Sequence, residues 1–232
     1  MWDPQAKPFA REFRVIRYDV RGFGRSSPAK APYSDADDLT RLLEHLDVDR
    51  PMLVGVSNGG RIALDFAVSH PDSVEALVPV CSGLHGYDPR ENPEAAAAFA
   101  ALDRAERELS RLYRTGKIGE AVEGVLALWC ATQGPRTRPL VQRMVTENAA
   151  AAFSEGEFSI PAAPSTAGRL GAIRAPTLVV TGERDVPAIH FIADHLDRAI
   201  PGATRTEIAG GDHLPNLSRT EPFNQVVLDF LR

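Results

Sequence analysis

Cysteine is scarce in this sequence, which has two among its 232 residues, Cys81 and Cys130. Cys81 ends an apolar, strand-like run and Cys130 lies in a helical stretch. The sequence therefore suggests neither a disulfide framework nor a cysteine-rich metal site. A reducing cytoplasm fits this cysteine usage best, and we expect no metal and no cofactor.

Long apolar runs and basic clusters are also missing. No apolar run approaches the length of a membrane span, and the N-terminus lacks the basic-then-apolar pattern of a signal peptide. Lys and Arg number 26 against 31 Asp and Glu, a net charge of -5, and no basic block could follow a phosphate backbone. We expect a cytoplasmic protein that binds neither membranes nor nucleic acid; the sequence leaves a homo-oligomer open.

The remaining composition is that of a globular protein, with 44% hydrophobic and 25% charged residues. Strands alternate with helices in the first part of the chain, with strands expected at 14–18, 52–56 and 74–80 and helices at 35–46 and 61–70. Ser34 is the expected N-cap of the first of these helices. This alternation predicts the α/β class, with a mostly parallel sheet flanked by helices.

The pattern then changes to helix alone, with helices expected at 94–112, 118–131 and 139–153. Strands return at 175–181 and 204–208, each followed by a helix, at 189–200 and 222–231. The chain thus divides into an α/β core segment at 1–85, an inserted helical cap at 86–170 and a second core segment at 171–232.

Ser57 stands in a Gly-x-Ser-x-Gly pattern between an apolar strand and an amphipathic helix. A sharp strand-to-helix turn exposes a serine hydroxyl and leaves little room for side chains two positions away. Gly55 and Gly59 are expected to meet that need. The alternative is a glycine-rich turn in which the serine only caps the helix.

Asp185 and His213 also lie just past the ends of predicted strands. Because side chains collect outside the carboxyl ends of strands in an open α/β sheet, these residues can converge on Ser57. An imidazole can take the proton of a serine hydroxyl, and a carboxylate can orient the imidazole and stabilise its cation. The sequence therefore predicts Ser57 as nucleophile, His213 as base and Asp185 as orienting acid.

Four motifs resemble the α/β-hydrolase superfamily over nearly the whole chain, and small bacterial esterases, enol-lactone hydrolases and cofactor-free haloperoxidases most. They are Asp-x-Arg-Gly-x-Gly-x-Ser at 19–26, Gly-Val-Ser-Asn-Gly-Gly at 55–60, Thr-Gly-Glu-Arg-Asp-Val-Pro at 181–187 and Gly-Asp-His-Leu-Pro-Asn at 211–216. The resemblance implies the same three catalytic roles, makes the backbone N–H of Asn58 an oxyanion donor, and implies that the cap shapes the pocket. It suggests a serine hydrolase that cleaves a small carboxylic ester, thioester or lactone.

Several alternatives stay open at this point. Glu183 is a rival to Asp185, and Asp212 is expected to face solvent or cap a turn. Asp19 and Arg21 are expected to hold their loop. The protein could also be a catalytically impaired or non-catalytic small-molecule-binding homologue, a cofactor-free haloperoxidase or an acyltransferase.

The sequence departs from the family at its N-terminus. The second oxyanion donor of the family comes from a His-Gly loop after a strand upstream of residues 14–18, and neither is found here. The family also places a strand between 14–18 and 52–56, so we expect an N-terminally incomplete fold with a gap in the sheet. Either the start of this sequence lies downstream of the real one, which we favour, or a short form has lost one donor, at a cost of about 2.7–4 kcal/mol of transition-state stabilisation.

Overall fold

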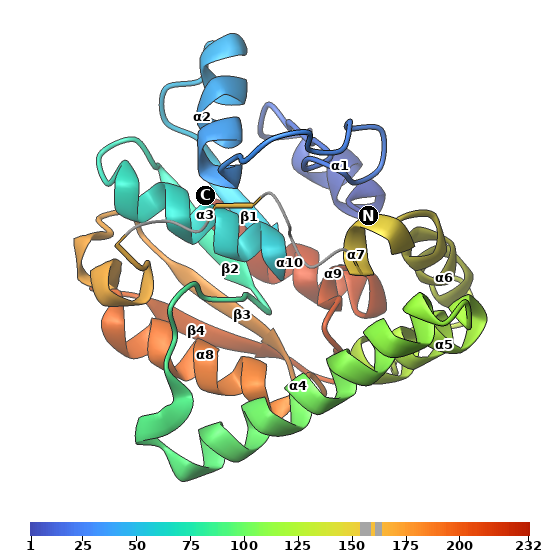
Figure 1. The fold of residues 1–232 in the computed structure, drawn as a ribbon. Helices are drawn as coiled ribbons and strands as arrows, with labels where there is room; N and C mark the ends of the chain where they lie inside the picture. The colour runs from blue at the N-terminus through green and yellow to red at the C-terminus, as the bar shows by residue number, and fades with distance from the viewer. Residues whose placement is uncertain (154–158, 161–163) are drawn as a thin grey trace.

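A computed structural model describes residues 1–153, 159–160 and 164–232. Its described residues contain a parallel sheet in the order β1-β2-β3-β4 (Figure 1), with all three neighbouring pairs parallel. The strands are β1 (Met52–Val56), β2 (Ala76–Val80), β3 (Leu178–Gly182) and β4 (Thr204–Ile208). The predicted α/β class with a parallel sheet is confirmed.

The two central strands explain why the sheet is buried. Every residue of β2 and β3 is buried, which matches their nearly continuous apolar sequences. The outer strands β1 and β4 are only partly buried. Because the strands are parallel, the carboxyl ends of β1 to β4 lie at the same edge of the sheet. Ser57, Asp185 and His213 follow these strand ends in the chain.

Helices cover both faces of the sheet. Figure 1 shows α3 (Asn58–Ser69) and α8 (Pro187–Ala199) in front of it, with α1 (Asp3–Phe9) and α10 (Thr220–Leu231) behind it. The helix α2 (Asp35–His45) packs on α3, and Ser34 caps it by accepting a hydrogen bond from the Asp37 N–H, as predicted. None of the described helices is long and apolar enough to cross a bilayer.

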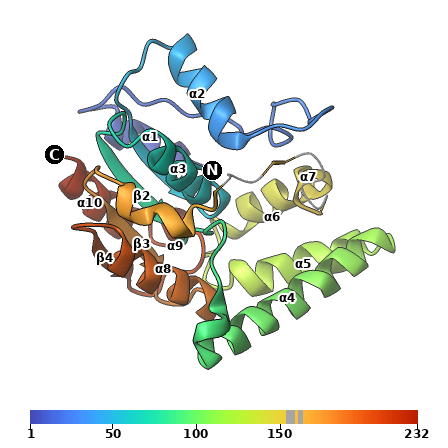
Figure 2. The same ribbon diagram turned by 60° about the vertical axis from the view of Figure 1, so that its left-hand side comes forward.

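Four of the described helices lie in the insertion between β2 and β3 and form a separate layer on one side of the molecule (Figure 2). They are α4 (Pro93–Arg114), α5 (Ile118–Trp129), α6 (Arg138–Glu147) and α7 (Ala149–Phe153). The single helix predicted at 139–153 is thus two helices that part at Asn148. Within the predicted cap at 86–170, residues 154–158 and 161–163 lie outside the described residues.

Three short helical turns complete the described elements: η1 (Pro89–Glu91), η2 (Ala167–Ala172) and α9 (Pro215–Ser218). The last of these follows the loop that carries His213.

The strand predicted at 14–18 is wrong. These residues form no strand, and Ile16 and Tyr18 leave 38% and 40% of their surfaces exposed. A segment with strand-forming residues such as Val15, Ile16 and Tyr18 becomes a strand only where a neighbouring strand satisfies its backbone groups, and no described strand lies beside this one. The strand β1 is therefore the edge of the described sheet, and the strand predicted fifth, at 204–208, is its fourth.

Candidate active site

Ser57 lies in the turn between β1 and α3 in a strained backbone conformation. Its φ is 55° and its ψ is -115°, a region that residues with a Cβ atom rarely occupy. Its N–H donates to the Val80 carbonyl at 2.9 Å, and its own carbonyl accepts from the Gly83 N–H at 3.3 Å. The side chain makes no capping hydrogen bond to α3, so the interpretation of Ser57 as a capping serine is wrong.

Close backbone packing maintains this turn. A Cβ atom on Gly55 would lie 2.3 Å from the Gly59 carbonyl carbon, and one on Gly60 would lie 2.5 Å from the Ser82 hydroxyl. A Cβ atom on Gly59 would meet nothing within 4 Å. The requirement predicted for glycine holds at Gly55, but its second position is Gly60 and not Gly59, because α3 passes Ser82 at that residue.

His213 and Asp185 form a buried pair at the ends of β4 and β3. The His213 Nδ1 atom lies 2.9 Å and 3.1 Å from the two carboxylate oxygens of Asp185. The Asp185 side chain is fully buried and that of His213 is 8% exposed. The Val186 N–H donates to Asp185 at 2.8 Å and fixes the carboxylate from the other side.

This contact sets the tautomer of the imidazole. An ionised carboxylate can only accept, so Nδ1 carries the proton, and Nε2 of the neutral ring presents a lone pair. The backbone N–H of His213 donates to the Trp129 carbonyl at 3.1 Å, and the Trp129 ring lies 4.3 Å from the imidazole between ring centroids. The last residue of α5 thus holds the histidine from the cap side.

The rival carboxylates have other partners. Glu183 accepts a hydrogen bond from the Gly210 N–H at 2.5 Å, and the described residues show no contact between Glu183 and His213, so Asp185 is the acid that the histidine contacts. Asp212 caps its turn by accepting from the Leu214 N–H at 3.1 Å, as one of the two expectations had it. It does not face solvent, because it is 1% exposed.

Asp212 also connects the histidine loop to the cap. It accepts hydrogen bonds from the Thr132 N–H at 3.0 Å and from the Gln133 side chain at 2.9 Å. Sequence reasoning missed Gln133 and the contact of Trp129 with the histidine loop, because no motif marks a residue that supports a loop about 80 positions away.

Asn58 is the first residue of α3, so its N–H has no partner within the helix. Its side chain is turned aside and accepts from Arg61 at 2.8 Å. A free backbone N–H at a helix start favours a bound anion, so the predicted role of Asn58 as an oxyanion donor stays a prediction that this position allows.

Cys81 lies beneath the histidine pair. It is fully buried, has a φ of 44°, and its sulfur lies within 4.8 Å of ligand atoms of Asp185 and His213. Burial, together with the negative charge of Asp185, raises the pKa of the Cys81 thiol well above its ordinary value, so the thiol stays protonated. These three residues are the one group of potential metal ligands found among the described residues. Both cysteines are free thiols.

The structure brings together two of the three predicted catalytic residues in direct contact. No hydrogen bond joins the Ser57 hydroxyl to the His213 Nε2 atom among the described residues, and both groups are without another hydrogen-bond partner there. Such contacts often tighten only when substrate binds.

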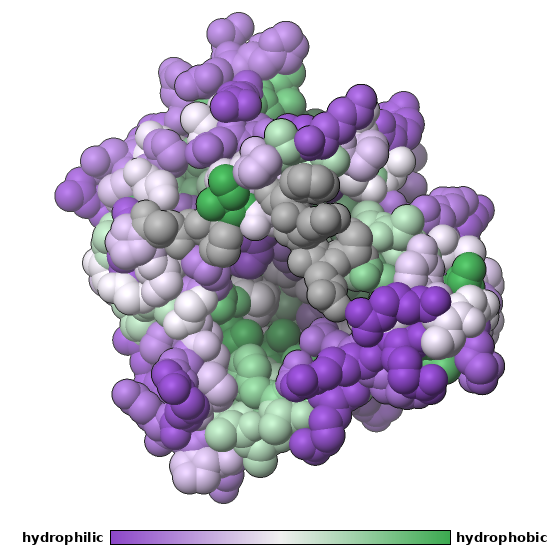
Figure 3. Space-filling view, in the orientation of Figure 1, coloured by the Kyte–Doolittle hydropathy of each residue, from purple (hydrophilic) through white to green (hydrophobic). Residues whose placement is uncertain are grey.

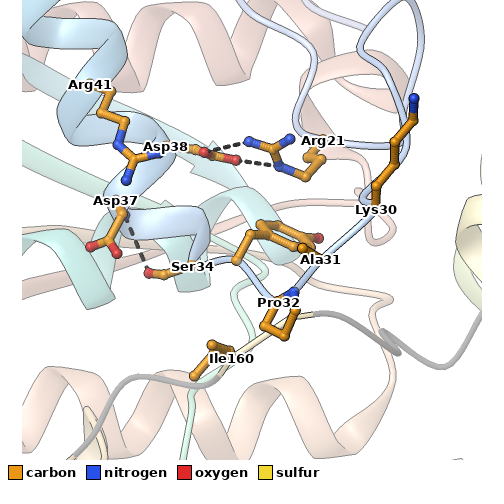
Figure 4. A pocket seen from close by; sticks show the side chains of 10 residues that line it. Arg21, Lys30, Ala31, Pro32, Ser34, Asp37, Asp38, Arg41 and Ile160 are labelled. Carbon is orange, nitrogen blue, oxygen red and sulfur yellow. Dashed lines mark hydrogen bonds and ion pairs between the residues drawn. The ribbon is translucent and has the colours of Figure 1, made fainter.

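A cavity of about 420 Å³ beside the start of α2 lies apart from these residues. Figure 4 shows Arg21 pointing at Asp38, to which it donates at 2.8 and 2.7 Å, and the cavity is lined by none of Ser57, Asp185 and His213. Arg21 and Asp19 hold their loop, as predicted: Asp19 accepts from the Arg25 N–H at 3.0 Å.

The comparisons with known proteins agree with this geometry. A family model described as the alpha/beta hydrolase fold matches residues 1–220. The chain belongs to this family. RutD of Variovorax paradoxus (strain S110), a candidate carbamate hydrolase, is 30% identical to this α/β hydrolase over 236 residues, which cover 99% of this chain and 86% of that protein.

Two solved α/β-hydrolase structures are similar over almost the entire chain. The enol-lactonase of Burkholderia xenovorans LB400 has a TM-score of 0.78 and 25% identity, covering 99% of this chain and 85% of its own. A thermophilic esterase of Thermogutta terrifontis has a TM-score of 0.75 and 28% identity, covering 100% of this chain and 84% of its own. These relatives support hydrolase activity in general, but their names specify different substrates: a carbamate, an enol-lactone and an ester.

Proposed function

We propose that this α/β hydrolase is a serine hydrolase that cleaves a small carboxylic ester, thioester or lactone through an acyl-enzyme on Ser57. The observation that carries the proposal is the buried His213–Asp185 pair at the same sheet edge as the strained Ser57. The names of the enol-lactonase and the esterase support the substrate class.

The proposed reaction starts with proton transfer. The lone pair of His213 Nε2 takes the proton of the Ser57 hydroxyl as the serine oxygen bonds to the substrate carbonyl carbon. The resulting imidazolium is stabilised by the Asp185 carboxylate, which takes up no proton during the reaction. The carbonyl oxygen becomes an oxyanion that accepts from the Asn58 N–H.

The tetrahedral intermediate then collapses. The bond to the alcohol, thiol or ring oxygen breaks, and the imidazolium gives its proton to this leaving group. Water repeats the sequence on the acyl-enzyme, with His213 again acting as base, and releases the acid and the free serine. No step requires a metal or a cofactor.

Hydrolysis of p-nitrophenyl acetate by the wild type and by the Ser57→Ala and His213→Gln variants tests this proposal. We expect both substitutions to lower kcat by at least about 10³-fold, because either one removes the nucleophile–base unit. Unchanged turnover in Ser57→Ala would contradict it. A non-catalytic binding protein would show no turnover of any ester and a ligand-induced rise in Tm that Ser57→Ala leaves intact.

A further inference from the structure

One helix of the cap presents a carboxylate where its other residues are apolar. Ala95, Phe99, Leu102, Glu106 and Leu109 recur at intervals of three and four residues, so they share one face of α4. Ala95 and Leu109 are buried, and Phe99 packs against the core. Glu106 is the one charged member of this stripe, and it is partly exposed and partly desolvated by its protein neighbours.

A cavity of about 480 Å³ runs along this helix. Residues of α4 from Ala96 to Glu106 form one wall, and Pro89 and Arg90 contribute to the other. Figure 3 shows a hollow in the middle of this side of the molecule, with hydrophobic surface on its floor. The uncharged residues of the wall formed by α4 are all apolar, so their side chains offer a charged group no hydrogen-bond partner.

The other charges of the cavity are already neutralised. Arg90 donates to both carboxylate oxygens of Asp88, at 2.8 and 3.0 Å. Asp103 forms an ion pair with Arg107, one turn further along α4. No hydrogen bond or ion pair to the Glu106 carboxylate is found among the described residues. Among the described residues, the Glu106 carboxylate is therefore the one charge of the cavity without a protein counter-ion.

Glu106 belongs to the lining of this cavity and lies within electrostatic range of His213. Burial raises the pKa of its carboxyl, and the charge of a protonated His213 acts on it in the opposite direction. In addition, α4 packs along α5, whose last residue contacts His213. A substrate with its carbonyl at Ser57 can thus extend toward Glu106.

We propose that Glu106 binds an alkylammonium group of the substrate and so selects cationic esters or lactones over neutral and anionic ones. An unpaired carboxylate in an apolar wall attracts a cation and repels an anion, and the ion pair forms where water is partly excluded. This inference rests on the proposed serine hydrolase, whose substrate class it narrows.

Two isosteric esters test it: the p-nitrophenyl esters of 4-(trimethylammonio)butanoic acid and 5,5-dimethylhexanoic acid, which differ in a quaternary nitrogen and a quaternary carbon. We expect the wild type to prefer the cationic ester at least about ten-fold in kcat/KM, and Glu106→Gln to reduce the ratio to about one. Glu108→Gln is the matched control, because it removes the same charge from the same helix. Glu108 is exposed and pairs with Arg111, so the ratio should stay at its wild-type value.

A wild-type ratio near one, or equal changes of the ratio in the two variants, would overturn the inference. The proposed function is judged separately by whether either ester is turned over and whether Ser57→Ala abolishes it. If neither ester is turned over, the hydrolase proposal fails, and calorimetric binding of the corresponding amides to Ser57→Ala tests the subsite alone. The subsite proposal holds if the cationic amide binds more tightly and adding Glu106→Gln removes this preference. Equal binding of both amides would overturn it.

Discussion

The proposed reaction depends on the Asp185 carboxylate, which contacts the proposed base, His213. Its two oxygens accept from the His213 ring and from the Val186 N–H, and its side chain has no exposed surface. A carboxylate held in this way orients the ring and stabilises the positive charge that the ring gains when Nε2 accepts the serine proton. Orientation and charge stabilisation both depend on one side chain.

Asp185→Asn should therefore lower kcat for p-nitrophenyl acetate by about 10³- to 10⁴-fold, since an amide can place its donor group against Nδ1 and favour the wrong tautomer. Glu183→Gln is the control. Glu183 lies on the same turn, and its amide can still accept from the Gly210 N–H. Equal losses in the two variants would show that the turn, and not the Asp185 contact, matters.

At the scale of single residues, the motifs located the strained turn at Ser57 and the buried Asp185–His213 pair, whose catalytic roles stay predictions. The motifs were not enough for Asp212, Gln133 or Glu106. A buried carboxylate that caps a turn has the same sequence as an exposed one, and whether Glu106 faces the cleft depends on how α4 is rotated against its neighbours. The burial of Asp212 and the orientation of Glu106 both depend on neighbours in space, which cannot be read from the sequence.

The elbow formed by β1 and α3 depends on two glycines, Gly55 and Gly60, because a side chain at either position would collide with its neighbours. Gly60 lies against Ser82 at the end of β2, whereas Gly59 has open space around its missing side chain. The sequence pattern locates the turn but does not say which neighbouring segment passes within contact distance.

Gly60→Ala should lower the free energy of unfolding by about 1–3 kcal/mol, because its methyl group overlaps the Ser82 side chain. Gly59→Ala should raise it by up to about 1 kcal/mol, since alanine costs less backbone entropy within a helix. Urea denaturation of both variants measures the difference. A larger loss in Gly59→Ala than in Gly60→Ala would contradict the packing described for the elbow.

Arg61 ties α3 to two other segments. It pairs with Asp35 at the start of α2, at 2.5 Å, and with Asp65 one turn further along α3, at 2.7 Å. Asp65 in turn accepts from Thr166, next to η2. Both carboxylate side chains are nearly buried, at 8% and 3% exposure, so they depend on this arginine for compensation.

Arg61→Ala should lower the free energy of unfolding by about 3 kcal/mol, because it leaves two poorly solvated carboxylates unpaired. Arg174→Ala removes a solvent-exposed ion pair with Asp72 and should cost no more than about 1 kcal/mol. Thermal or denaturant unfolding of the two variants checks both values. Similar costs at the two sites would mean that burial of the Arg61 pairs is unimportant.

At the scale of the whole molecule, hydrophobic periodicity predicted the sheet, its flanking helices and the helices inserted between β2 and β3. It failed at residues 14–18, where the local pattern favours a strand but no described strand lies beside it. Strand formation depends on partners as well as on sequence, whereas an amphipathic helix needs only one apolar surface. The cap helices were accordingly predicted better than the edge of the sheet.

The assembled molecule places a strained serine, a helix N-terminus and a buried acid–histidine pair at one edge of a parallel sheet, beneath a helical cap. The proposed activity requires all of them to act on one bond. Asp212, Gln133 and Trp129 link that edge to the cap, so the cap positions the histidine as well as covering it.

Covalent labelling with a fluorophosphonate probe, read by intact mass and by the mass of the modified peptide, tests this arrangement most directly. A fluorophosphonate reacts only with a serine whose hydroxyl is activated, so we predict one adduct per chain, on the peptide that contains Ser57. It should be absent in Ser57→Ala and greatly slowed in Asp185→Asn. Labelling of Ser57→Ala to the same extent as the wild type, or an adduct on another serine, would contradict the proposal that Ser57 is the nucleophile.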